Sequence, residues 1–157
     1  MERLHRIAWF NPITLLGTPI LAAVGCYSYW MTSGFQVGDI ALLVTMYTLI
    51  GISITAGYHR HFAHKTYDCH WSIQLFYLLF GAAGFQNSAL EWSAQHRVHH
   101  REVDTDNDPY NPQRGFFWSH MGWIFFEETC DPEFKTVPDL KKNPLVMWQH
   151  RHYLFIG

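Results

Sequence analysis

The apolar run FQVGDIALLVTMYTLIGISITAG at residues 35–57 decides the fold, and it lies one residue before the motif HRHFAH at residues 59–64. Its one charged residue, Asp39, is close to its start. A second apolar run, FNPITLLGTPILAAVGCYSYW at residues 10–30, carries no charge. Both runs reach about 20 residues, the length of helix that crosses roughly 30 Å of bilayer hydrocarbon. The sequence therefore predicts transmembrane helices over residues 10–30 and 35–57.

The charges that flank this hairpin predict its orientation. The connection at residues 31–34 is short and uncharged, whereas Arg3, Arg6, Arg60 and Lys65 flank the other ends of the two runs. The positive-inside rule then places both ends in the cytoplasm. A cleavable signal peptide is disfavoured because the first run is too long and lacks a clear cleavage site. A buried helical hairpin of a soluble protein is the alternative.

Composition narrows the class of protein. The 157 residues are 48% hydrophobic, 17% aromatic and 15% charged, with a formal net charge of −2. Such a chain is neither disordered nor collagen-like, and without a basic cluster it offers no surface for nucleic acid. Asp104, Asp106 and Asp108 open like a calcium loop, but the glycine and the glutamate that such a loop needs are missing. No P-loop, GxGxxG, GxSxG or HExxH motif is present.

Beyond the hairpin, we expect residues 58–144 to form a cytosolic or interfacial region that carries the histidine motifs. The stretch at residues 71–90 is apolar but interrupted by polar residues, so it is either a third span or, as we favour, a helix against the membrane interface or the core. A helix over residues 71–100 and another over 115–126 are predicted. Residues 145–157 begin a further hydrophobic element.

Two histidine windows carry the chemistry. On one α-helix, His59 and His64 would lie about 140° apart, so they can converge only if the helix ends between them. In the second window, His96, His99 and His100 have the i, i+3, i+4 spacing of one helical face. A metal ion would satisfy all five imidazoles at once. Because imidazole binds Fe, Zn, Cu and Ni alike, residue type alone does not choose the metal.

In these motifs the sequence resembles the membrane fatty acid desaturases of the acyl-CoA delta-9 (stearoyl-CoA) type, in bacterial form. The match runs in order along most of the chain. The motifs that carry it are GYHRHFAH at residues 57–64, FQN at 85–87, EW at 91–92, HRVHH at 96–100, TDNDPYN at 105–111 and RGFFWSHMGW at 114–123.

The resemblance implies a di-iron (Fe²⁺) centre and two groups of site residues. Proposed iron ligands and catalytic residues are His59, His64, His96, His99 and His100. Proposed neighbours of the iron or the acyl chain are Asn87, Glu91, Trp92 and Trp123.

The implied reaction inserts a cis double bond into a long-chain saturated acyl-CoA or acyl-lipid. It uses molecular oxygen and two electrons from a donor such as a ferredoxin or a b-type cytochrome. The implied location is a bacterial inner membrane, crossed several times, with the histidine motifs in the cytoplasm.

Members of this family carry a third HxxHH motif after a second membrane hairpin, and residues 1–157 contain neither. We therefore expect an all-α, N-terminal part of a desaturase domain, inactive alone. Two alternatives stay open. One is a related di-iron membrane hydroxylase or ketolase, and the other is a non-catalytic membrane protein that binds metal or haem.

Overall fold

The structure, a computed structural model, describes residues 7–126, 131 and 133–157. Over these residues the chain is helical, and the β pairing is an isolated bridge between Ile7 and Phe126. The predicted all-α class is thus confirmed. Arg3 and Arg6, on which the predicted orientation partly rests, lie outside the described residues. In chain order the helices are α1 (Phe10–Ser33), α2 (Val37–Ile52), η1 (Ser53–Ala63), α3 (Trp71–Ala82), α4 (Ala89–Arg101), η2 (Pro112–Arg114), α5 (Phe116–His120), η3 (Gly122–Phe125), η4 (Leu140–Lys142) and α6 (Pro144–Ile156).

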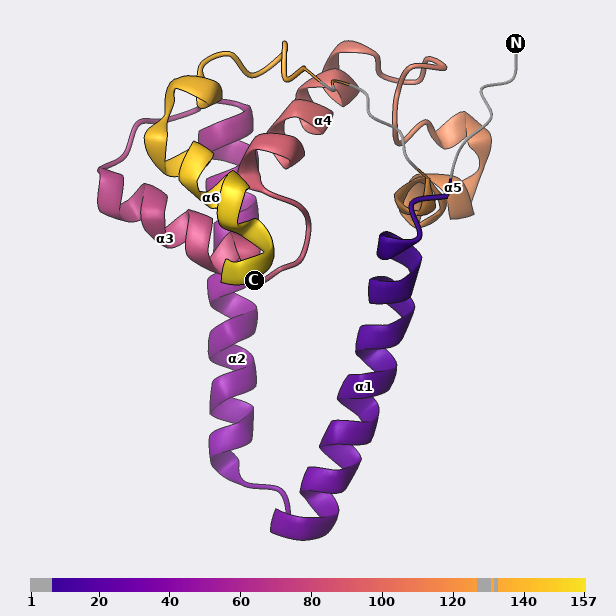
Figure 1. The fold of residues 1–157 in the computed structure, drawn as a ribbon, viewed down its shortest axis with the longest axis vertical. Coiled ribbons are helices and arrows are strands. Elements are labelled where there is room, and N and C mark those ends of the chain that lie inside the picture. Colours follow the sequence, from indigo (N-terminus) through magenta and orange to yellow (C-terminus); the bar gives the residue numbers. More distant parts are fainter. Residues whose placement is uncertain (1–6, 127–130, 132) are drawn as a thin grey trace.

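Helices α1 and α2 form a long hairpin that projects from a group of shorter helices (Figure 1). This group, from η1 to α6, is here called the head. The turn needs Gly34, whose φ of 68° is left-handed. Two helical stretches, α1 and the continuous Val37–Ala63, are long and apolar enough to cross a membrane. Their most apolar windows are only 0% and 11% buried within the structure. The helices of a buried soluble hairpin would be covered, so this exposure favours the membrane prediction.

Hydroxyl groups within the hairpin bond to the helix that carries them. The hydroxyls of Thr14, Thr18 and Thr48 each donate to the carbonyl oxygen four residues earlier, at 2.7–2.9 Å. Bilayer hydrocarbon offers no water to a polar group, so bonds within the same helix are what such surroundings require. The polar content of the two runs therefore agrees with a membrane location.

Helix α2 passes without a break into η1, which is a π-helix. In a π-helix each backbone N–H bonds the carbonyl five residues earlier, and the N–H of His64 donates to the carbonyl of His59 at 3.0 Å. The helix ends at Ala63, between these two histidines as predicted, but its last turns are π-helical, which the sequence did not indicate. The Tyr67 hydroxyl supports the wide turns from outside, donating to the carbonyl of Ala56 at 2.8 Å.

Residues 71–100 form two helices, α3 and α4, so the prediction of one helix is wrong. Between the two helices, Phe85 and Asn87 have φ values of 51° and 68°, which an α-helix excludes. Ser88 then starts α4, its hydroxyl accepting the N–H of Glu91 at 3.3 Å. With 12 residues, α3 is too short to span a bilayer, which supports the core or interfacial interpretation of this stretch.

The head packs around Tyr58, which is fully buried. The side-chain N–H of Gln149 donates to the Tyr58 hydroxyl at 2.6 Å. The side-chain oxygen of Gln149 accepts the backbone N–H of Ala89 at 3.0 Å. Gly81 on α3 is needed here, because a Cβ at that position would overlap the Tyr58 ring. Gln149 belongs to α6, which packs on α3 and α4. The hydrophobic element expected to begin near residue 145 is therefore this helix.

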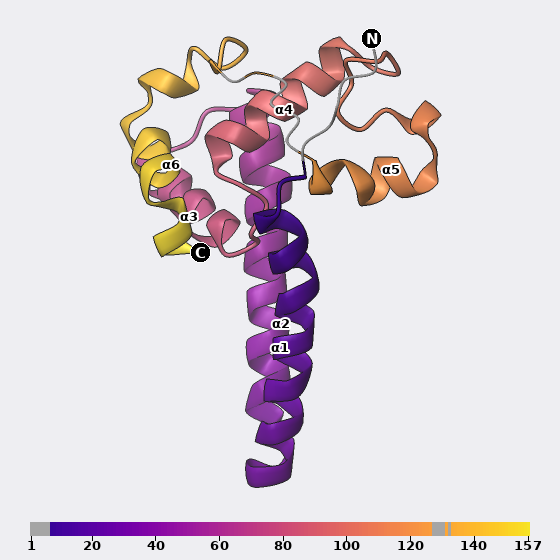
Figure 2. The same cartoon turned by 45° about the vertical axis from the view of Figure 1, so that its right-hand side comes forward.

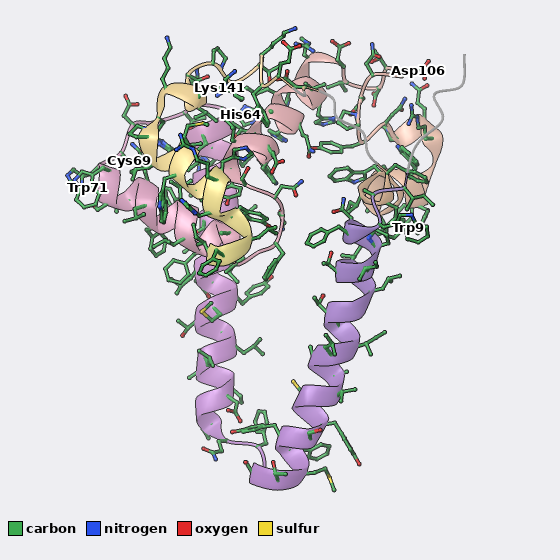
Figure 3. The ribbon with its side chains drawn as sticks, viewed as in Figure 1. Trp9, His64, Cys69, Trp71, Asp106 and Lys141 are labelled. Carbon is green, nitrogen blue, oxygen red and sulfur yellow. The ribbon has the colours of Figure 1, made fainter. Side chains whose placement is uncertain are left out.

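The aromatic segment expected as one helix over residues 115–126 forms the short helix α5 followed by the 3₁₀ turn η3. In Figure 2, α5 runs across the direction of the hairpin. The side-chain amide of Asn11 donates to the carbonyl of Ile124 at 2.8 Å. This bond ties η3 to the start of α1, where Figure 3 labels Trp9.

Candidate metal centre

The π-helix places His59 and His64 on one face. Since its hydrogen bonds join residues five apart, side chains at i and i+5 lie one above the other. The ring centroids of the two histidines are 4.6 Å apart. His61 lies on another side, with its Nδ1 2.9 Å from the carbonyl oxygen of Tyr67. The spacing HxxxxH thus suits the wide winding of η1.

Helix α4 supplies a second pair, His96 and His100, by ordinary α-helical geometry. These residues are one turn apart, and their ring centroids are separated by 4.6 Å. The helix begins with a capping box in which Ser88 and Glu91 each bond the other's backbone. The cap satisfies backbone N–H groups that lack partners at the start of α4, and the α-helical winding then aligns the two imidazoles.

The four imidazoles converge from the two helices. One ring nitrogen from each of His59, His64, His96 and His100 lies within 4.8 Å of the others. His96 is central, because its Nε2 is 3.0 Å from Nε2 of His64 and 3.1 Å from Nε2 of His100. Figure 3 shows His64 where η1 meets the rest of the head. Ring nitrogens gathered in so small a volume form a donor set that suits a transition metal.

The electrostatics of this cluster favour neutral imidazoles. Desolvation by the surrounding protein, reinforced by His100, His59, His64 and His99, lowers the pKa of His96 to about 3. Desolvation, then His59 and His100, also lowers the pKa of His64. Both rings are therefore neutral at pH 7, and neutral imidazole is the form that binds a metal.

His99, the fifth histidine of the predicted set, is not one of these four. Its Nδ1 lies 2.8 Å from the carboxylate of Asp108, and its ring centroid is 5.4 Å from that of His100. Burial alone would raise the pKa of Asp108, but bonds from His99 and from the N–H groups of Tyr110 and Asp104 lower it overall. A carboxylate on Nδ1 leaves Nε2 of a neutral histidine free to bind a second ion.

The four other predicted site residues take different places. Trp92 lies at the cluster, stacked on His96 with ring centroids 4.7 Å apart. The ring of Trp123 contacts the ring of Tyr110, with centroids 4.6 Å apart, and the Tyr110 ring in turn contacts that of His99. The carboxylate of Glu91 takes part in the cap of α4.

Asn87 lies in the turn before α4, where its N–H donates to the hydroxyl of Tyr153 at 3.1 Å. The structure thus brings Trp92 to the histidine cluster and joins Trp123 to its edge through Tyr110. It places Glu91 in the cap of α4 and bonds Asn87 to Tyr153 of α6.

Three residues around the cluster were missed by the sequence analysis. Asp108 was considered as part of a calcium loop and of the TDNDPYN motif but not as a partner of His99, which it holds. Arg97 lies inside the HRVHH motif and binds Asp139, which is 42 residues away. The position of Arg97 directly after His96 was the available signal, but no spacing rule pointed to Asp139.

Comparison with known proteins shows that the chain is similar to acyl-CoA desaturases. The sequence is 36% identical to "Acyl-CoA desaturase 1" of Saccharomyces cerevisiae over 97% of this chain and 30% of the relative. It is 33% identical to the "Acyl-CoA Delta-9 desaturase" of Acheta domesticus, over 97% of this chain and 43% of the relative. A third relative, "Acyl-CoA Delta12-desaturase" of the same organism, is 35% identical over 94% of this chain and 42% of the relative.

No protein-family model matches the chain. The chain spans between 30% and 43% of the length of these three relatives. The comparisons support the fatty acid desaturase family, whose named members are oxidoreductases. The relatives are eukaryotic, so the bacterial type stays a prediction.

Proposed function

We propose that this chain carries part of the metal centre of a membrane fatty acid desaturase that inserts a cis double bond, of the delta-9 type, into a saturated acyl chain. The observation that carries the proposal is the convergence of His59, His64, His96 and His100 within 4.8 Å. This cluster follows directly on a helix apolar enough to span a membrane, in a chain similar to named acyl-CoA desaturases.

The donor set fits iron. Imidazole nitrogens bind Fe²⁺, and the cluster supplies four of them, two held neutral by lowered pKa values. His99, oriented by Asp108, would offer its Nε2 to a second iron. Five imidazoles are too few to fill the coordination of two irons, so the proposal requires further ligands from elsewhere in the protein.

Iron would supply the oxygen chemistry needed to remove hydrogen from an unactivated methylene group, a step beyond any amino-acid acid or base. The chain's own residues orient the metal ligands and shield the cluster from water. Asp108 fixes the tautomer and orientation of His99. Trp92, stacked on His96, covers one side of the cluster with an apolar ring and excludes water there.

The proposed substrate is a long-chain saturated acyl-CoA or acyl-lipid, with electrons supplied by a ferredoxin or a b-type cytochrome. The relatives' names support an acyl-CoA, and they differ in the position of the bond that is made. We expect the acyl chain to reach the metal from the membrane side, because η1 joins the cluster directly to α2.

The test is the fatty-acid profile of a yeast host that lacks its own acyl-CoA desaturase and expresses the full-length protein with this sequence. We expect growth without added unsaturated fatty acid and a delta-9 monounsaturated product by gas chromatography. The His64→Ala variant should give neither, while His61→Ala should behave as the parent protein. Hydroxylated chains in place of unsaturated ones would favour the hydroxylase alternative and overturn the proposal.

A further inference from the structure

Arg97 is bonded on every side by groups from other parts of the chain. Its Nε donates to the carbonyl of Ala63 at 2.9 Å, and its Nη2 donates to the carbonyl of Phe62 at 2.8 Å. Its Nη1 donates to the carbonyl of Thr136 at 2.8 Å. These acceptors belong to η1 and to the segment before η4, so one guanidinium joins three parts of the head.

Asp139 completes this arrangement. Both of its carboxylate oxygens accept from Arg97, at 2.8 and 3.1 Å, in the paired geometry that arginine favours. The same carboxylate bonds the Lys65 ammonium at 3.0 Å. Burial opposes the charge of this carboxylate, but the bonds from Arg97 and Lys65 outweigh it and lower the pKa of Asp139.

The positions of these contacts along the chain relate them to the histidines. Arg97 directly follows His96. The carbonyl that it binds on Ala63 directly precedes His64, and Lys65, which Asp139 binds, directly follows His64. The two histidines therefore each adjoin the Arg97–Asp139 pair, and their Nε2 atoms are 3.0 Å apart.

The last carbonyl groups of a helix lack partners within it and need donors from outside. Arg97 satisfies two of them at the end of η1. The side chain of Arg97 is only 18% exposed, so its bonds to five oxygens form largely shielded from water. Charge-assisted bonds in such surroundings are stronger than those at an open surface.

We propose that Arg97 and Asp139 are positioning residues that hold His64, at the C-terminal end of η1, against His96 on α4, and so set the geometry of the metal site. This inference rests on the proposed metal centre. The pair touches neither the metal nor a substrate. It acts through the backbone of η1, which would otherwise be free to tighten toward an α-helix and turn His64 away from the cluster.

The test is Co²⁺ binding to the full-length protein with this sequence, purified in detergent, followed by the visible absorption of the bound ion. We expect Arg97→Gln to weaken Co²⁺ binding by about 10- to 100-fold, the usual effect of losing a residue that orients a ligand. Arg97→Lys should recover little of this loss, because an ammonium has only three donors and cannot serve three carbonyls and both carboxylate oxygens together. Asp139→Asn should also weaken binding, and adding it to Arg97→Gln should cause little further loss.

The matched control is Arg101→Gln, which removes an arginine of the same helix that pairs with Glu102 at the surface. Binding by this variant should match the parent chain. Circular dichroism reports whether each variant keeps its helices. If Arg97→Gln unfolds, the positioning role is tested on Arg97→Lys and Asp139→Asn instead. The proposal requires a weaker or altered Co²⁺ spectrum in a variant that is still helical.

Two results would overturn the proposal, and they differ in what else they imply. If the parent chain binds Co²⁺ and the Arg97 and Asp139 variants bind it equally well, the positioning role fails while the four-histidine site stands. If the folded parent chain binds no Co²⁺, the four-histidine site itself fails, and the positioning role and the proposed function fail with it.

Discussion

The two histidine motifs solve the same problem with different helices. On α4, His96 and His100 share a face because four residues make about one α-helical turn. His59 on η1 and His64, which caps its C-terminal end, are five residues apart, and they share a face because the helix has widened into a π-helix. The first arrangement is intrinsic to any α-helix. The second depends on neighbours that hold an uncommon winding, so its geometry is the more sensitive to changes elsewhere.

The largest effect is expected from breaking the link between the two motifs. His96 has ring nitrogen contacts with both His64 and His100. We expect His96→Ala to lower metal affinity more than about 100-fold, since even residues that only orient a ligand are worth about 10- to 100-fold. Metal analysis after dialysis measures this. His61→Ala, which alters a histidine of η1 outside the cluster, should retain the metal, and equal losses in the two variants would contradict the site.

A smaller effect on the α4 motif is expected from Asp108→Asn. The amide cannot hold the His99 imidazole as a carboxylate does, so we expect iron bound by the full-length protein to weaken by about 10- to 100-fold at one of two ions. Iron-to-protein ratios at increasing chelator concentration report this. Asp104→Asn changes a carboxyl group in the same loop and should have no such effect. If both variants retain the full iron content, His99 is not a ligand.

The π-helical motif is tested separately by Gly81→Ala. The new methyl group would overlap the Tyr58 ring, and overpacking of this kind costs about 1 to 3 kcal/mol of unfolding free energy. Thermal unfolding in detergent measures the change. Gly51→Ala is the control, because nothing lies within 4 Å of the position its methyl group would take. A Gly81→Ala protein as stable as this control would show that Tyr58 does not pack tightly against α3.

The smallest effect is expected at the start of α4. Ser88→Ala removes the N-cap hydroxyl and should cost about 1 kcal/mol, with a modest drop in the unfolding temperature. The α4 motif should keep its metal affinity, because an α-helix needs no outside support to align His96 with His100. The control is Ser72→Ala, which changes an exposed serine in the first turn of α3. A large loss of metal affinity in Ser88→Ala would mean that the α4 motif is as dependent on its neighbours as the π-helical one.

Sequence patterns predicted the features that depend on local spacing. Apolar length predicted the hairpin, although α1 continues to Ser33 and the second helical stretch to Ala63. The spacing of His96 and His100 predicted their shared face. The spacing of His59 and His64 correctly predicted a helix end between them, but it gave no sign that the last turns are π-helical.

Contacts between distant segments could not be predicted in this way. Asp139 is 42 residues from Arg97, and Gln149 is 91 residues from Tyr58. No periodicity links such positions, because each contact forms only when the chain has folded back. The break at Phe85 and Asn87 was missed although Asn87 was an available signal, because Asn commonly takes a left-handed conformation at a helix end.

By itself, the sequence determined two apolar helices, the neighbouring histidine motifs and the desaturase resemblance, because hydrophobic length and residue spacing are properties of adjacent residues. Only the tertiary structure decided that α2 continues as a π-helix, that His99 turns to Asp108, and that Arg97 and Asp139 join η1 to α4. These features are set by which carbonyl, carboxylate and ring groups are left to bond one another once the helices pack. That pairing is a property of the whole fold.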